Sequence, residues 1–358
     1  MISPNLPYQP LLELSRGDLV ESVHCGAIAI SDKQGNLIGS IGDLQLVTFL
    51  RSSAKPFQAL PLIESGADEF YGLTPQEISL ICASHSGTDE HVAILTDLQA
   101  KVGISEAQLL CGIHPPYDEQ TAFTLKLHGQ QPTSNRHNCS GKHTGMLIYS
   151  KFVEITSPEY ISLDHPLQKR ILTSLAEMAE LSVDQINLGI DGCSAPNFAI
   201  PLRSAAQAFA RLCDPAELSS SRARACQKIT SAMMAYPIMV AGRERFDTRL
   251  MDTLPGRIVS KGGAEGYQGI GIMRDTLYPG SPSLGIAIKI ADGDLNGRVR
   301  PAVTLEVLHQ LGAIPEEDLN KLVEFGPVKT LKNWRQKEVG TSQPCFNLDI
   351  HTEFLPRE

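Results

Sequence analysis

The order of strand-like and helix-like segments is the feature that most restricts the fold of this chain of 358 residues. Runs rich in Val and Ile, typical of strands, lie near both ends, at residues 19–24, 26–31, 37–41, 257–260 and 284–291. Between these two groups, apolar residues recur every three or four positions, which is typical of helices. This order predicts an α+β fold in which N- and C-terminal strands form one sheet and a largely helical subdomain is inserted between them.

Helix signals define the middle of the chain. Helices are expected at residues 90–102, 166–181, 215–235 and 301–311. The tetrapeptide from Thr74 to Glu77 resembles a helix start. No linker-like segment separates the parts, so we expect a single domain over residues 1–358. Its sheet subdomain would comprise about residues 1–50 and 255–358, and its helical subdomain about residues 51–254.

Charge and apolar content restrict the partners and the location of the protein. The net charge of -9 argues against nucleic acid and anionic membranes as main partners, because both are polyanions. The N-terminus lacks the features of a secretory signal, and the most apolar stretch, 284–290, is interrupted by Lys289 and is too short to cross a bilayer. A cytoplasmic protein with a small polar substrate is therefore expected. In that compartment the eight scattered cysteines are expected to be reduced thiols.

The segment 52–65 contains an S-x-x-K motif at its start. Pro56 is tolerated only in a first helical turn, so the helix must begin near Ser52, and Pro61 is expected to kink it. Positions three apart lie on one helix face, so Ser52 and Lys55 can approach each other. A lysine that has lost its proton can activate a serine hydroxyl as a nucleophile. An isolated match of this kind is more often a helix cap followed by a solvated lysine.

Two later segments strengthen the catalytic interpretation of the motif. Ser84 lies in a short hydroxyl-rich loop after an apolar run, and Lys261 ends a strand and precedes two glycines. The penicillin-recognising serine enzymes place S-x-x-K, a hydroxyl-bearing motif and a lysine-containing strand in the same chain order. Each residue alone is more often an ordinary turn residue or an exposed strand-end charge, but the ordered set favours a serine hydrolase.

Longer motifs around these residues resemble a known family, the Rhizobium etli-type or class 3 L-asparaginases. The motifs are RSSAKP at 51–56, CASHSG at 82–87, CGIHPP at 111–116, HNCSGKH at 137–143, DGCSAP at 191–196 and KGGAEG at 261–266. The resemblance extends from about Leu12 to Cys345, which is nearly the whole chain. It implies hydrolysis of L-asparagine to L-aspartate and ammonia, a homodimer, and an antiparallel sheet in a fold akin to serine β-lactamases and glutaminases.

The resemblance also implies roles for individual residues. It pairs Ser52 with Lys55 and Ser84 with Lys261 as catalytic groups. Four residues in the matching motifs would line the substrate pocket: Arg51, His137, Asn138 and Asp191. We expect Asp191 to bind the substrate α-ammonium and Arg51 its α-carboxylate, although a turn residue and a surface charge are the plainer interpretations. The residues do not determine which of Ser52 and Ser84 attacks the substrate.

Cys139, Lys142 and Cys193 form a second group. Two thiolates, a nitrogen and a water satisfy tetrahedral Zn²⁺, but a lysine must first lose its proton, so His143 or His137 would be the conventional nitrogen ligand. Spacing alone favours two buried thiols and a solvated lysine. The resemblance implies instead a zinc site at Cys139, Lys142 and Cys193, which we expect to organise the pocket and tune affinity.

Other functions remain open from the sequence. Gly262 stands where β-lactamases have Thr, and the chain lacks their S-D-N motif, which argues against penicillin recognition. Hydrolysis of glutamine or a β-lactam is nevertheless an alternative, because the length of a pocket cannot be deduced from sequence. A zinc-dependent amino-acid-binding protein without turnover is a second alternative, which the intact serine and lysine residues disfavour.

Overall fold

The computed structural model describes residues 7–155 and 158–350. Residues 1–6, which belong to the N-terminal segment predicted to lack a secretory signal, lie outside the described residues. The chain divides into two compact units. The sheet unit comprises Met1–Ser53, Ile200–Asp214 and Arg257–Glu358, and the helical unit comprises Ala54–Ala199 and Pro215–Gly256. The sheet unit thus combines segments from both ends of the sequence with the internal segment Ile200–Asp214.

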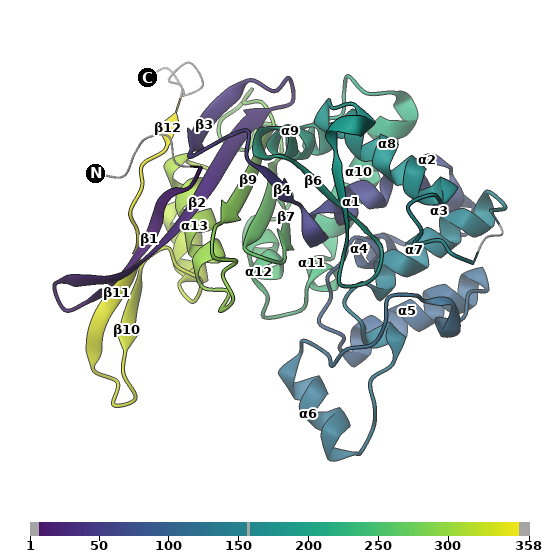
Figure 1. Cartoon of the computed structure of the whole chain (residues 1–358), viewed down its shortest axis with the longest axis horizontal. Coiled ribbons are helices and arrows are strands. Elements are labelled where there is room, and N and C mark those ends of the chain that lie inside the picture. Colours follow the sequence, from purple (N-terminus) through teal and green to yellow (C-terminus); the bar gives the residue numbers. More distant parts are fainter. Residues whose placement is uncertain (1–6, 156–157, 351–358) are drawn as a thin grey trace. The chain divides into compact units, whose positions relative to one another are not determined.

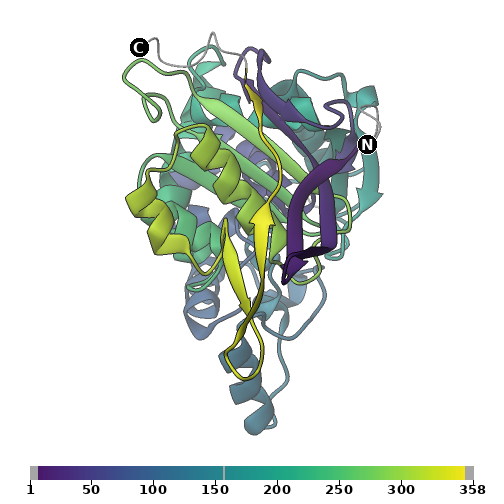
Figure 2. The same ribbon diagram turned by 90° about the vertical axis from the view of Figure 1, so that its left-hand side faces the viewer.

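An antiparallel sheet built from both ends of the chain forms the sheet unit (Figure 1). Its strands are β1 (Gln9–Arg16), β2 (Leu19–Asp32), β3 (Leu37–Ile41), β7 (Ile258–Gly263), β8 (Tyr267–Ile272), β9 (Leu284–Ile290), β10 (Lys329–Lys332), β11 (Glu338–Pro344) and β12 (Asp349–Ile350). The main path runs β10-β11-β1-β2-β9-β8-β7, while β3 pairs with β2 and β12 with β3. Figure 2 shows the purple N-terminal strands beside the yellow C-terminal ones. The predicted α+β fold with a sheet from both termini is confirmed.

Helix α9 (Leu202–Cys213) explains why the sheet unit includes the segment 200–214. The helix packs on β9, β2 and β8, and glycines on these strands make room for it. A Cβ atom on Gly285 would lie 1.7 Å from the carbonyl oxygen of Ala206, and one on Gly269 would lie 2.1 Å from the Phe209 ring. The sheet unit also contains β4 (Val47–Phe49), α13 (Val299–Gln310) and α14 (Glu316–Leu319).

The helical unit contains most of the helices of the chain (Figure 1). These are α1 (Lys55–Gln58), α2 (Leu60–Glu64), α3 (Ala67–Phe70), α4 (Pro75–Ile81), α5 (Asp89–Val102), α6 (Glu119–Leu127), α7 (Ser140–Phe152), α8 (Pro166–Ala179), α10 (Ser220–Ala235), α11 (Pro237–Val240) and α12 (Phe246–Thr253). Strand β5 (Asn187–Ile190) pairs with β6 (Pro196–Pro201). The predicted start at Thr74 is confirmed, because its hydroxyl accepts from Glu77 N while the Glu77 carboxylate accepts from Thr74 N. Helix α4 packs against α7 and α10.

The segment expected as one helix over 52–65 consists of three pieces. A 3₁₀-helix at Arg51–Ala54 is followed by α1 and α2, and each α-helix has its proline in the first turn. Because proline lacks an N–H group, Pro61 cannot continue the hydrogen bonding of α1 and instead starts α2. Lys55 therefore begins a new helix directly after the 3₁₀-helix that carries Ser52.

Two further expectations concern thiols and membranes. All eight cysteines are free thiols in the structure. Within residues 7–155 and 158–350, no helix combines the length and apolar character needed to cross a membrane.

Candidate active site

Lys55 and Ser84 are in direct contact within the helical unit. Lys55 is almost fully buried, and its Nζ donates to Ser84 Oγ at 2.9 Å, to Ala83 O at 2.6 Å and to Asn138 O at 3.3 Å. Ser84 follows the C-terminal end of α4, and its N–H donates to Val240 O at 2.8 Å. A buried amine next to a half-buried hydroxyl is the arrangement in which a lysine can remove a serine proton.

His85 stabilises the loop that carries Ser84. Its ring is fully buried, with Nδ1 accepting from Gly87 N at 3.1 Å and Nε2 lying 2.8 Å from Ser140 Oγ. Because the Ser140 hydroxyl donates to Asn135 O at 2.9 Å, Nε2 of His85 must be the donor to Ser140. Burial lowers the pKa of His85 well below its ordinary value, so the ring stays neutral beside Lys55. This role could not be predicted from the sequence, because a single histidine in a loop has many structural uses.

His137 and Asn138 lie against the same lysine. The peptide between Asn138 and Cys139 is fixed at both ends, since its carbonyl accepts from Lys55 and its N–H donates to His137 Nδ1 at 3.0 Å. Burial, reinforced by the neighbouring His114, lowers the pKa of His137 to about 4. A neutral His137 keeps Nδ1 as an acceptor and adds no positive charge next to Lys55.

Cys139, Lys142 and Cys193 lie together in the helical unit and are all buried. Lys142 Nζ donates to Cys193 Sγ at 2.9 Å. A hydrogen bond with Cys193 lowers the pKa of Cys139 well below its ordinary value. Burial alone would lower the pKa of Lys142, but the adjacent sulfurs raise it. The group is thus an ammonium beside sulfur, a pairing that helix α7 and the turn before β6 create from residues far apart in the chain.

The same three side chains fit a metal ion in their donor chemistry. Two sulfurs and one nitrogen gathered in a buried place are ligands that Zn²⁺ accepts, provided that Lys142 releases its proton. Among the residues that the structure describes, no set of three or more His, Cys, Asp or Glu side chains is placed to hold a metal. His143, the conventional nitrogen ligand, is also buried and hydrogen-bonds with Cys193. Asp191 lies beside it, with Oδ2 4.0 Å from Cys193 Sγ and Oδ1 accepting from Gly192 N.

The remaining predicted residues belong to the sheet unit. Arg51 has a positive φ of 51°, and its guanidinium lies 3.8 Å from the Glu265 carboxylate. Lys261 is fully buried on β7, and its Nζ donates to Gly262 O at 2.9 Å. Gly263 faces the Leu50 carbonyl, which a Cβ atom would approach to 2.5 Å, so this glycine allows the segment before Arg51 to lie against β7. The unit boundary falls inside the S-x-x-K motif, with Ser52 in the sheet unit and Lys55 in the helical unit.

Comparison with known proteins gives a family and several distant structures. A family model for L-asparaginase II matches residues 12–344. No curated protein sequence matched significantly. The chain is similar to a Bacillus glutaminase solved in 4.3 M NaCl (11% identity, TM-score 0.37, covering 80% of this chain and 90% of that one). It is also similar to Mglu solved with tris and glutamate (13% identity, TM-score 0.42, covering 81% and 60%). The family predicted from the motifs is confirmed by the match over residues 12–344.

Proposed function

We propose that this chain, which belongs to the L-asparaginase II family, hydrolyses L-asparagine to L-aspartate and ammonia. Family membership makes the protein an amidohydrolase with a small-molecule substrate. The contact between Lys55 Nζ and Ser84 Oγ is the observation that carries the proposal, because amide hydrolysis through an acyl-enzyme needs a hydroxyl with a base beside it. The choice of asparagine rests on the family and on the motif resemblance.

In the proposed reaction, a serine oxygen attacks the side-chain amide carbon of the substrate and gives its proton to a lysine amine. The C–N bond then breaks, and the leaving nitrogen takes that proton from the lysine and departs as ammonia. Water next attacks the carbonyl carbon of the aspartyl ester and gives a proton to the lysine amine; the bond between that carbon and the serine oxygen breaks, and the serine oxygen takes the proton from the lysine as aspartate leaves. Lys55 is the proposed base. Ser84 is the hydroxyl that it contacts, and Ser52 is the nucleophile expected from the S-x-x-K motif.

Substrate binding is assigned to the groups expected from the sequence. Asp191 would bind the α-ammonium group, a charge pair that partial burial strengthens. Arg51 would bind the α-carboxylate and would exchange part of its contact with Glu265 to do so. Glutamine differs from asparagine by one methylene, which is worth about 1–3 kcal/mol in a shaped pocket. Ammonia release from the two amino acids at equal concentration measures this preference.

Zn²⁺ is proposed at Cys139, Lys142 and Cys193, where it would supply positive charge that orders the pocket and raises substrate affinity. The residues themselves hold the donor atoms together and exclude water by their burial. Chelation is expected to raise KM while kcat at saturating asparagine persists. A loss of kcat with an intact fold would assign the metal a chemical role.

Trapping of the acyl-enzyme tests the proposal. Wild type, Ser52→Ala and Ser84→Ala are mixed with asparagine, quenched in acid and digested, and the peptide that carries an aspartyl ester is identified by mass spectrometry. The nucleophile variant is expected to lose kcat by several orders of magnitude while asparagine binding survives. Lys55→Arg should be equally slow, because a guanidinium stays protonated. Tight asparagine binding by the wild type without ammonia release would reject the proposed function in favour of a binding protein.

A further inference from the structure

The motif at residues 111–116 has no part in the proposed reaction, yet its histidine contacts a residue that holds Lys55. His114 Nε2 lies 3.1 Å from Asn138 N, and Asn138 O accepts from Lys55 Nζ. His114 and Lys55 therefore meet opposite ends of the same residue. All three belong to the helical unit.

The hydrogen bonds determine which nitrogen of His114 carries the proton. Nδ1 lies 2.6 Å from Pro115 O, which can only accept, so Nδ1 is the donor. Nε2 accepts from the Asn138 N–H. The side-chain oxygen Oδ1 of Asn138 is placed 3.1 Å from the same nitrogen, and because two acceptors repel each other, we assign the amide with its NH₂ group toward the ring. The backbone hydrogen bond of Asn138 depends on an acceptor at the Nε2 position.

Neighbouring rings hold His114 in this orientation. Tyr117 stacks on it with ring centroids 4.8 Å apart and planes inclined by 19°, and the Arg245 guanidinium lies 5.8 Å from the Tyr117 ring centre. The His137 ring lies 4.2 Å away on the segment that contains Asn138. Tyr117 is half-exposed, so this stack extends from the protein surface to the residue that contacts the buried lysine. Stacked planar groups of this kind restrict the rotation of the imidazole.

We propose that His114 is a positioning residue for the reaction, which fixes Asn138 so that its carbonyl holds Lys55 against Ser84. The inference rests on the proposed function for its kinetic consequence, but the contact itself can be measured separately. His114 acts through Asn138, whose N–H donates to Nε2 and whose carbonyl accepts from Lys55 Nζ. Loss of the acceptor frees the 137–139 segment and lengthens the time that Lys55 spends away from Ser84.

Two amide substitutions of His114 provide a matched test. The Gln side chain places an oxygen near the Nε2 position, whereas the Asn side chain is one methylene shorter and reaches only the Nδ1 position. His114→Asn is expected to lower kcat about tenfold with KM within twofold of wild type, the effect of one lost hydrogen bond in the transition state. His114→Gln is expected to restore most of kcat. Equal kcat in the two variants, or a loss that appears only in KM, would overturn the proposal.

Hydrogen exchange separates this proposal from the proposed function. In wild type and His114→Gln, the amide of Asn138 has an acceptor, so the peptide spanning 137–139 should exchange slowly. In His114→Asn, its exchange is expected to be at least tenfold faster. If exchange is faster in His114→Asn than in His114→Gln but the wild type releases no ammonia, the proposed function is rejected while the contact between His114 and Asn138 is retained. Identical exchange in both variants would reject the positioning role whatever the activity.

Discussion

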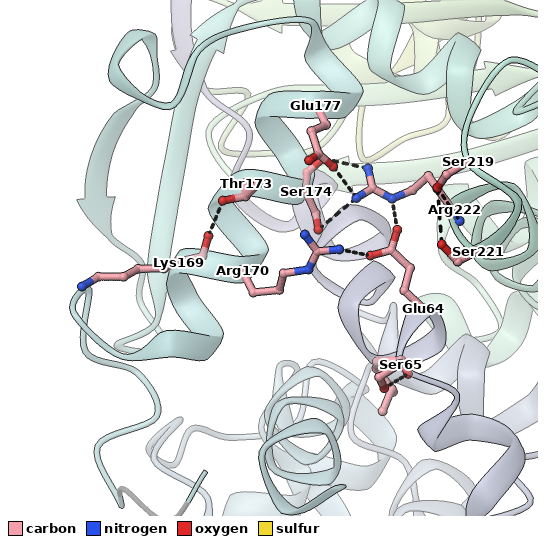
Figure 3. A network of polar contacts seen from close by, with 11 residues as sticks. Glu64, Ser65, Lys169, Arg170, Thr173, Ser174, Glu177, Ser219, Ser221 and Arg222 are labelled. Atoms are coloured by element: carbon pink, nitrogen blue, oxygen red, sulfur yellow. Dashed lines mark hydrogen bonds and ion pairs between the residues drawn. The ribbon is translucent and has the colours of Figure 1, made fainter. Parts of the chain in front are cut away.

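Arg222 provides a quantitative test of how the helical unit is held together. It lies on α10, and Figure 3 shows its guanidinium between Glu64 and Glu177. Its Nε donates to Glu64 Oε1 and its Nη2 donates to Glu177 Oε2 at 2.6 Å. The side chains of Arg222 and Glu64 are only 5% and 8% exposed. Arg222 therefore joins α10 to α2 through a buried contact with Glu64 and to α8 through the exposed Glu177.

Arg222→Met removes one member of this pair and leaves the Glu64 carboxylate buried. Such a loss typically costs about 3–5 kcal/mol. Arg170, whose Nη2 donates to the other carboxylate oxygen at 2.8 Å, remains and is 40% exposed, so the lower end of this range, about 3 kcal/mol, is expected. With an unfolding entropy of about 2.1 cal/mol/K per residue, Tm should fall by about 4 °C if the chain unfolds as one cooperative unit.

Differential scanning calorimetry of four proteins measures this effect: wild type, Arg222→Met, Arg170→Met and the double variant Glu64→Leu/Arg222→Met. Arg170→Met is the control for loss of a half-exposed arginine from the same carboxylate, and its Tm is expected to fall by about 1 °C or less. The double variant should recover most of the lost stability, because no unpaired charge stays buried. A decrease in Tm of less than about 1 °C for Arg222→Met would refute this reasoning. A double variant with a Tm as low as that of Arg222→Met would refute it as well.

Two further stability predictions follow from the structure. Burial holds the pKa of His85 well below its ordinary value, so below about pH 6.5 the unfolded chain binds a proton that the folded chain excludes. Tm should therefore fall between pH 7.5 and 5.5, and a fall of the same size in His85→Gln would show that this ring is not responsible. Gly285→Ala places a Cβ atom 1.7 Å from Ala206 O and should destabilise by about 3 kcal/mol or more, whereas Gly192→Ala meets nothing within 4 Å and should leave Tm nearly unchanged. Equal Tm values for these two variants would contradict the packing of α9.

Much of the fold could be predicted because it depends on local patterns. Val- and Ile-rich runs at both ends predicted the sheet, and the Thr74 start predicted α4. The placement of α9 was not predicted, because its reason lies in glycines such as Gly269 and Gly285 that are about sixty residues or more away in the chain. The spacing of apolar residues within one segment does not show which strands a helix packs against.

The sequence predicted which residues belong to the candidate site, but it did not predict which of them are in contact. The S-x-x-K spacing indicates which groups can share a helix face, yet the structure starts a new helix at Lys55 and directs its amine to Ser84. The contact of Lys142 with Cys193 joins positions 51 residues apart, which no local pattern encodes. His114 gave a signal only through its motif, since a single histidine has no spacing to interpret.

The position of β1 in the sheet affects how the protein can be made. β1 lies between β2 and β11, with Leu12 opposite Pro344, so one edge of this strand pairs with a segment that follows it by more than 300 residues. During synthesis that edge stays unpaired until β11 has emerged from the ribosome. Unpaired strand edges recruit other chains, so the nascent protein is exposed to aggregation until β11 has been made. Truncation shortly before β11 should consequently yield chains that depend on chaperones to stay in solution.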